Sequence, residues 1–133
     1  MKKYSPNAPC PCDSGTKYKK CCQIYHKGAR AKDALTLMKS RYAAYAAGMS
    51  DYILRTTHPD NPDYSTDRKS WKESIEVFSQ GTDFLGLEIE AYTAGEQEAF
   101  VTFTAILSSG EMRERSRFLK EDGIWLYVEG EML

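Results

Sequence analysis

The chain has 133 residues and a mass of 15.1 kDa, which suits one domain with a small core, or one domain with a short appendage. Hydrophobic residues make up 41% of the sequence, so it has the apolar content that an intrinsically disordered chain lacks. No apolar run reaches the roughly 18 residues of a membrane span, and no apolar stretch follows Lys2 and Lys3 as in a signal peptide. We therefore expect a cytoplasmic protein without a transmembrane segment.

Charge is distributed unevenly along the chain. Residues 1–32 contain eight basic side chains and one acidic side chain, whereas residues 33–133 contain ten basic and eighteen acidic ones. The formal net charge of −1 therefore conceals a head of +7 and a body of −8. We expect a small N-terminal part over residues 1–30 and a larger domain over residues 31–133.

The head contains all four cysteines of the chain, Cys10, Cys12, Cys21 and Cys22. Two close pairs separated by a short loop can surround one tetrahedral metal ion. Disulfides would need an oxidising compartment, and four unrelated free thiols would not be expected to cluster so closely. A catalytic zinc keeps one position open for water, so four cysteines predict a single structural ion, with zinc expected and iron as the alternative.

Residues 10–22 read CPCDSGTKYKKCC and resemble the SEC-C motif, the zinc-binding tail of the bacterial preprotein-translocase ATPase. That motif usually has Gly where this chain has Asp13, and Asp tolerates a left-handed backbone better than most residues. The basic side chains and interleaved aromatic ring of the motif could recognise an acidic protein, ribosomal or other nucleic acid, or an anionic lipid. The alternative is a solvated zinc tail that only tethers. The candidate partner-binding residues are Lys17, Tyr18, Lys19 and Lys20.

The segment after the cysteines predicts a short basic connector over residues 23–32, with His26 in solvent. A helix is expected over 32–48, because apolar residues recur on one face and several alanines favour helix. Asp33 suits its first turn, and Gly48 suits its end.

Two shorter helices should follow. One is expected over 50–57 with Ser50 as its cap, and the other over 67–80 with Ser65 or Thr66 as its cap. Two prolines and several turn-forming residues place a loop between them, over 59–66.

From residue 83 onward the apolar period changes from that of a helix to that of a strand. Short turns rich in glycine separate the runs, so neighbouring strands should be antiparallel. The expected fold is α+β, with three helices followed by a four-stranded meander over residues 84–92, 99–107, 111–120 and 124–129.

This order of elements resembles the NTF2-like fold, a curved sheet wrapped against helices to form a cone. Several short motifs are similar to the YchJ family, also called UPF0225, which joins a SEC-C motif to an NTF2-like body in bacteria and is functionally uncharacterised. The motifs are Arg41-Tyr42-x-x-Tyr45, residues 51–59 (DYILRTTHP), residues 115–118 (RSRF), Asp122-Gly123, Trp125-x-Tyr127 and Gly130.

From this resemblance we also expect a ligand pocket between the first long helix and the sheet. The alternative is that its aromatic residues are plain core and that Arg41 and Arg55 pair with acids of the body. The candidate pocket residues are Arg41, Tyr42, Tyr45, Arg55, His58, Trp71, Arg117, Trp125 and Tyr127.

Catalysis has one weak candidate, His58, because an unperturbed imidazole titrates near pH ~6.5. Its activating partner would be Asp51 or Glu114, and the alternative is a loop cap before Pro59. The sequence contains no nucleotide-binding or hydrolase motif, so we assign no catalytic residue and consider an enzyme the less favoured reading.

Three arginines, Arg113, Arg115 and Arg117, alternate along one predicted strand. They could bind phosphate, or they could pair across strands with acids such as Glu98 or Glu129.

The leading hypothesis is a non-enzymatic binding or adaptor protein. Its zinc head would recognise a protein partner, with nucleic acid or the ribosome as the other candidate, and its sheet could form a homodimer. The alternative function is a small-molecule-binding or enzymatic body.

Overall fold

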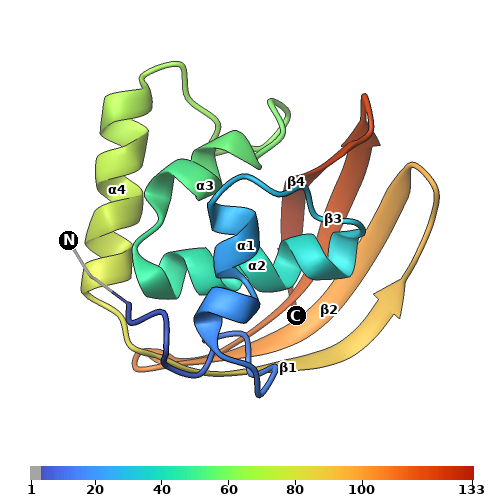
Figure 1. The fold of residues 1–133 in the computed structure, drawn as a ribbon. Coiled ribbons are helices and arrows are strands. Elements are labelled where there is room, and N and C mark those ends of the chain that lie inside the picture. Colours follow the sequence, from blue (N-terminus) through green and yellow to red (C-terminus); the bar gives the residue numbers. More distant parts are fainter. Residues whose placement is uncertain (1–3) are drawn as a thin grey trace.

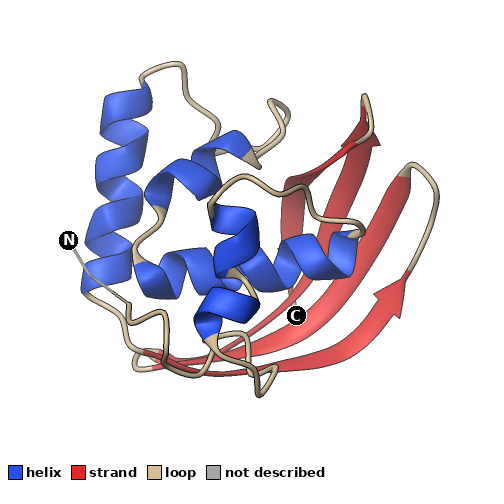
Figure 2. Cartoon of the chain, viewed as in Figure 1, coloured by secondary structure: helices blue, strands red, loops and turns tan. Residues whose placement is uncertain are grey.

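The computed structural model describes residues 4–133, where helices cover one face of a curved sheet (Figure 1). Figure 2 shows that the strands lie together on one side and that the helices and the N-terminal loops lie on the other. No helix among these residues is both long and apolar enough to cross a lipid bilayer. The helical elements are the 3-10 helix η1 (Tyr18–Lys20), α1 (Gln23–His26), α2 (Ala34–Ala47), α3 (Ser50–Arg55) and α4 (Arg68–Gln80). The strands are β1 (Phe84–Thr93), β2 (Glu98–Leu107), β3 (Gly110–Glu121) and β4 (Ile124–Met132).

Helix α2 begins and ends where its sequence predicts. The side chain of Asp33 accepts a hydrogen bond from the backbone N–H of Thr36 at 2.8 Å, and thereby caps the first turn. Gly48 ends the helix with a φ of 73°, a left-handed backbone that glycine adopts without steric cost.

The caps of the two later helices differ from the predictions. Ser50 is the first residue of α3 rather than its cap, and its buried Oγ has no hydrogen-bond partner among the described residues. Helix α4 is capped by Asp67, not by Ser65 or Thr66, because the Asp67 carboxylate accepts the backbone N–H of Ser70 at 3.1 Å. Carboxylates and hydroxyls cap helices comparably well, so residue type left these neighbouring positions undecided.

The four strands pair in the order β1-β2-β3-β4, each antiparallel to the next, as predicted. Asp122 and Gly123 join β3 to β4 with φ values of 53° and 79°, the backbone of a tight two-residue hairpin. The register shifts at Phe84/Gly86, Ile89/Ala91 and Arg117/Phe118, and such bulges bend and twist a sheet. The resulting curve makes one face concave.

The core lies between this concave face and the helices. Alternate residues of β2 are buried, among them Val101 and Phe103, while Ala43 and Ala44 of α2 are fully buried on the helical side. Small side chains on α2 let the helix approach other elements closely. The expected α+β architecture is confirmed, with helices on one face of a curved meander.

Candidate metal centre and interior cavity

The cysteines are brought together by a tight loop in the head. Pro9 and Lys17 pair as an isolated antiparallel bridge, and the backbone N–H of Cys10 donates to the carbonyl of Thr16 at 2.9 Å. Asp13 and Gly15 turn the chain with φ values of 63° and 82°. Asp13 therefore takes the left-handed backbone that its sequence position predicts.

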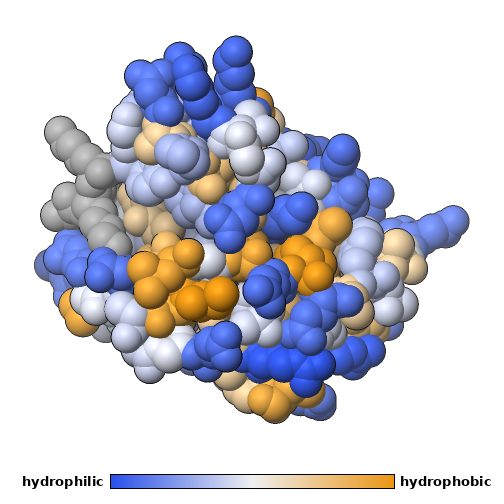
Figure 3. Space-filling model, turned by 90° about the horizontal axis from the view of Figure 1, so that it is seen from below, coloured by the Kyte–Doolittle hydropathy of each residue, from blue (hydrophilic) through white to orange (hydrophobic). Residues whose placement is uncertain are grey.

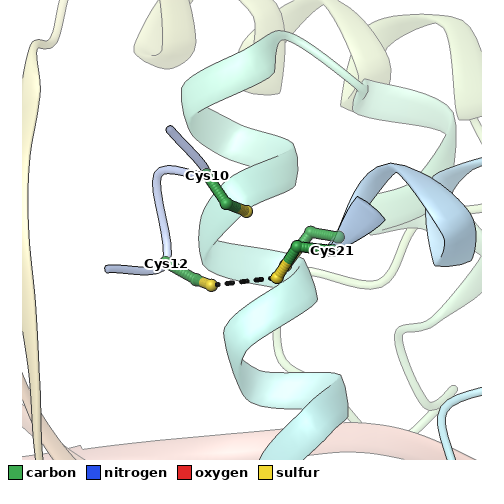
Figure 4. A group of neighbouring side chains, drawn as sticks. Cys10, Cys12 and Cys21 are labelled. Atoms are coloured by element: carbon green, nitrogen blue, oxygen red, sulfur yellow. Dashed lines mark hydrogen bonds between the residues drawn. The ribbon is translucent and has the colours of Figure 1, made fainter. Parts of the chain in front are cut away.

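The four sulfur atoms of Cys10, Cys12, Cys21 and Cys22 lie within 4.8 Å of one another. Three of these side chains are buried and Cys21 is partly exposed. Figure 4 shows the side chains of Cys10 and Cys12 directed toward that of Cys21. The Cys12 and Cys21 sulfurs are 3.6 Å apart, close to the ~3.8 Å edge of a tetrahedron with Zn–S bonds of about 2.3 Å. All four thiols are free, so the cluster is positioned to hold a metal ion.

The electrostatics of the cluster call for a cation. Hydrogen bonds from the Cys10 and Cys22 thiols lower the pKa of Cys12 to about 2. The bond to Cys12 raises the pKa of Cys10 to about 12, and bonds to Cys10 and Cys12 raise the pKa of Cys22. One thiolate thus forms at the expense of its neighbours, because their thiols donate hydrogen bonds to it and keep their own protons. A divalent ion would remove that conflict and allow all four to ionise.

The head packs against the body through His26, which lies in α1. Its Nε2 donates to the carbonyl of Ser40 in α2 at 2.8 Å, so its Nδ1 accepts the hydroxyl of Tyr18 at 2.6 Å. Burial lowers the pKa of His26, although the bond to Ser40 opposes the shift. The prediction of a solvated connector residue is therefore wrong: His26 is 5% exposed, because α1 packs onto α2. The ring also contacts Tyr52 of α3 with a centroid separation of 4.8 Å.

Two further contacts hold the head in place. The Asp13 carboxylate accepts the backbone N–H of Leu87 in β1 at 3.0 Å, and Figure 1 shows the head loop lying beside that strand. On the other side, Nη2 of Arg55 donates to the carbonyls of Tyr25 and His26, which end α1. The head is therefore attached to the sheet and to the helices at once. The expected boundary near residue 30 stays a prediction.

The residues expected to bind a partner divide into two groups. Lys17, Lys19 and Lys20 are exposed, and none of them forms an ion pair within residues 4–133. Tyr18, in contrast, is 2% exposed because its ring packs inside the head and its hydroxyl bonds to His26. Tyr18 thus supports the loop from within, and it is not part of the exposed basic surface.

An interior cavity of about 540 Å³ lies between α2, α4 and the concave face of the sheet. Five of the nine predicted pocket residues line it: Arg41, Tyr42, Tyr45, Trp71 and Tyr127. Arg41 is buried and forms no ion pair within residues 4–133, contrary to one of our expectations; its Nη1 donates to the Ile53 carbonyl and to Thr56 and Thr57.

The other four predicted pocket residues lie elsewhere. His58 is buried beside β3, where Nε2 contacts the Glu121 carboxylate and Nδ1 accepts the backbone N–H of Asp60. Its partner is therefore neither Asp51 nor Glu114. Arg117 pairs with Glu98 at 2.7 Å, facing away from the cavity. Arg55 and Trp125 line a separate, smaller hollow of about 220 Å³.

The three arginines of β3 are occupied within the sheet. Arg117 pairs with Glu98, one of the partners that its sequence suggested, and Arg113 pairs with Glu90 at 2.9 Å. Arg115 lies over the ring of Phe100 at 4.0 Å. Cross-strand pairing thus accounts for all three.

Sequence reasoning did not place Glu114, Ser116 and Thr57 in the cavity, although the structure does. The alternation of side chains along the strand could have indicated two of them, Glu114 and Ser116. Residues on a strand point alternately to opposite faces, so an outward Arg113, Arg115 and Arg117 imply an inward Glu114 and Ser116.

The fold and the cysteine cluster define an NTF2-like domain with an N-terminal SEC-C motif. Residues 33–130 match the family described as the YchJ middle NTF2-like domain, and residues 7–24 match the SEC-C motif. The chain belongs to this family, UPF0225. A UPF0225 protein of Deinococcus radiodurans is 39% identical over 95% of this chain and 91% of its own length.

Two solved structures share the whole arrangement. A SEC-C motif containing protein from Rhodopseudomonas palustris has a TM-score of 0.77 at 32% identity, covering 95% of this chain and 99% of its own. Another from Psychrobacter arcticus has a TM-score of 0.78 at 29% identity, covering 92% of this chain and 81% of its own. These likenesses confirm the predicted fold and the SEC-C motif.

Proposed function

We propose that this chain is a cytoplasmic binding protein, without catalytic activity, whose zinc-stapled head recognises an acidic segment of a protein partner. The observation that carries the proposal is the set of three exposed lysines, Lys17, Lys19 and Lys20, which lie in η1 or directly before it, between the two pairs of cysteines. Lysines without an ion pair are free to meet external carboxylates. Zinc is the ion we assign, because four cysteine ligands close its tetrahedron and leave no position for water or substrate.

The way the head is attached supports recognition rather than simple tethering. Asp13 fixes one side of the loop to β1, and His26 fixes the other side to α2. A binding surface that is already ordered loses less entropy when a partner docks. The free thiols that the metal requires also fit a reducing compartment such as the cytoplasm.

Figure 3 shows the molecule from below, the side where the N-terminal loops lie in Figure 1, and apolar residues lie there in separate groups among hydrophilic ones. The outer face of the sheet, where we expected a homodimer contact, carries the pairs Arg113–Glu90 and Arg117–Glu98. Permanent interfaces are usually more apolar than this, which favours the head as the recognition surface.

A photo-crosslinking amino acid placed at Lys19 tests the proposal in the bacterium to which the chain is native. We expect a discrete protein adduct that disappears when Lys17→Glu and Lys20→Glu are added. The matched control carries the crosslinker at Lys69, an exposed lysine of α4 that should give no such adduct.

The adduct also separates the kinds of partner. A protein band that survives nuclease treatment supports the proposal, whereas a nuclease-sensitive adduct would assign the head to nucleic acid. Identical labelling from positions 19 and 69 would show that the head has no recognition role.

A further inference from the structure

We infer that the interior cavity is a binding site for a small amphipathic carboxylic acid that also carries a hydrogen-bond donor. The acid group would pair with Arg41, the donor would bond to Glu114, and the apolar body would fill the space between them. This site is separate from the head surface, so it stands or falls independently of the proposed function.

Arg41 supplies the anchor for the acid. Its side chain is 7% exposed, and the bonds from Nη1 to Ile53, Thr56 and Thr57 fix the guanidinium at the wall of the cavity. No carboxylate in residues 4–133 lies within 4.0 Å of it. A buried cation that contacts no carboxylate directly is costly to maintain. A guanidinium has five N–H donors, and the bonds from Nη1 together with one to the Tyr45 side chain leave donors able to hold a carboxylate.

Tyr127 connects this cation to the second polar group of the cavity. The Arg41 Cζ lies 4.6 Å from the centre of the Tyr127 ring, and the Tyr127 hydroxyl donates to Oε2 of Glu114 at 3.1 Å. Burial raises the pKa of Tyr127, so the hydroxyl keeps its proton at neutral pH. The cation thus lies over the face of the ring and the anion at its hydroxyl, so a ligand in the cavity can meet both beside one aromatic side chain.

Glu114 is held so that one of its oxygens is free. Ser116 and Tyr127 both donate to Oε2, whereas Oε1 accepts no hydrogen bond from residues 4–133. The backbone leaves room for this arrangement at Gly130 on β4. A Cβ there would lie 2.2 Å from Glu114 Oε2 and 2.7 Å from the Tyr127 hydroxyl. The free Oε1 is suited to accept a hydroxyl or ammonium group of a ligand.

The remaining walls are mainly apolar. Trp71 comes from α4, Phe103 from β2, and Met112 and Phe118 from β3. A volume of about 540 Å³ is in the usual range for small-molecule sites. Apolar walls that carry Arg41 and Glu114, with the exposed Asp63 also in the lining, suit a molecule that has both an apolar body and paired polar groups.

Calorimetry with the full-length, metal-loaded chain tests this inference with matched probes. We expect 3-phenyllactate, which has the acid and a hydroxyl, to bind at least tenfold more tightly than 3-phenylpropionate, which lacks the hydroxyl. It should also bind at least tenfold more tightly than 3-phenyl-1,2-propanediol, which lacks the acid. Failure of every probe to bind at millimolar concentration, or equal binding of the diol, would overturn the inference.

Variants of Glu114 and Arg41 test which group of the ligand each side chain binds. Glu114→Gln keeps the shape but removes the charge, so it should weaken L-phenylalanine, which carries an ammonium group, more than 3-phenyllactate. Arg41→Lys should weaken both acids, because lysine cannot bind a carboxylate in bidentate fashion. Glu96→Lys, an exposed residue in the turn between β1 and β2, is the control and should leave both affinities unchanged.

Arg41 also supports the fold, so a second readout uses the unmutated chain. The Nε–Hε resonance of Arg41 should shift during titration with 3-phenyllactate and stay in place with the diol. A resonance that responds to neither compound would contradict the assignment of the acid to Arg41.

Discussion

At the scale of single residues, the geometry of the cysteine cluster depends on a few backbone positions as much as on its sulfurs. Asp13 and Gly15 adopt left-handed φ values, and this lets Cys10 and Cys12 face Cys21 and Cys22. The sequence alone showed the cysteine spacing and the presence of Asp13 where the SEC-C motif usually has Gly. The burial of His26 was not, because its partners Tyr18 and Ser40 come from elements whose contact only the fold establishes.

Replacing a buried sulfur should empty the metal centre. We expect the native chain to carry about one zinc ion, and Cys22→Ser to lose it together with several kcal/mol of unfolding free energy. Elemental analysis of chelator-free protein, paired with thermal unfolding, measures both quantities. Ser14→Ala is the control, because its hydroxyl contacts the Cys21 sulfur at 3.2 Å but is not needed as a ligand. A metal content that survives Cys22→Ser would contradict the four-sulfur site.

The absence of a side chain at Gly130 gives room to the Glu114 carboxylate. Gly130→Ala places a methyl group 2.2 Å from Glu114 Oε2, so the flexible carboxylate must move from its hydrogen bonds with Ser116 and Tyr127, and we expect a cost of about 1 kcal/mol in denaturant unfolding. In a Glu114→Ala background the same substitution should cost much less, because the clashing carboxylate is gone. Additive effects of the two substitutions would show that Gly130 is needed for another reason.

At the scale of elements, the head is attached by α1 and by one hydrogen bond to the sheet. The sequence predicted a connector over residues 23–32, and the structure contains α1 there. A helix of four residues is too short to give a periodic pattern, and isolated helices of this length are unstable in water. Packing against α2 stabilises it, so its existence could be decided only in the folded molecule.

The contact between Asp13 and β1 should control how firmly the head is held. Asp13→Gly suits the left-handed backbone but removes the acceptor for the Leu87 N–H, which we expect to cost about 1 kcal/mol and to speed exchange of that amide. Amide hydrogen exchange measures this directly. Asp13→Asn keeps an acceptor and should retain most of the protection. Unchanged exchange in Asp13→Gly would show that the bond does not hold the head to the strand.

At the scale of the whole molecule, several tyrosines are packed between the helices and the sheet. Tyr42 donates to the carbonyl of Gly86 at 2.7 Å and so links α2 to β1. Tyr52 contacts Ser40 at 2.7 Å and so links α3 to α2. Burial raises the pKa of Tyr42 to about 12 and also raises that of Tyr52. The folded chain therefore resists ionisation that the unfolded chain allows.

This difference predicts the alkaline limit of stability. Unfolded tyrosines lose their protons near pH ~10, whereas Tyr42 in the folded chain keeps its proton to about pH 12. The contribution of Tyr42 to stability should be constant below pH 10 and should fall as the pH rises from 10 to 12, because the unfolded state then binds fewer protons. Tyrosinate absorbance and circular dichroism, recorded together, check this. Full tyrosine ionisation near pH 10 without loss of structure would contradict it.

The sequence by itself determined the class of fold and identified the four cysteines that are positioned to hold a metal ion. Both are local properties: helix and strand periods are visible over a few residues, and Cys10, Cys12, Cys21 and Cys22 lie within thirteen positions. Only the tertiary structure decided the contents of the cavity, because Arg41, Glu114 and Tyr127 are far apart in the chain. Sheet curvature, helix packing and the room at Gly130 bring them together, and none of these is encoded by a local pattern.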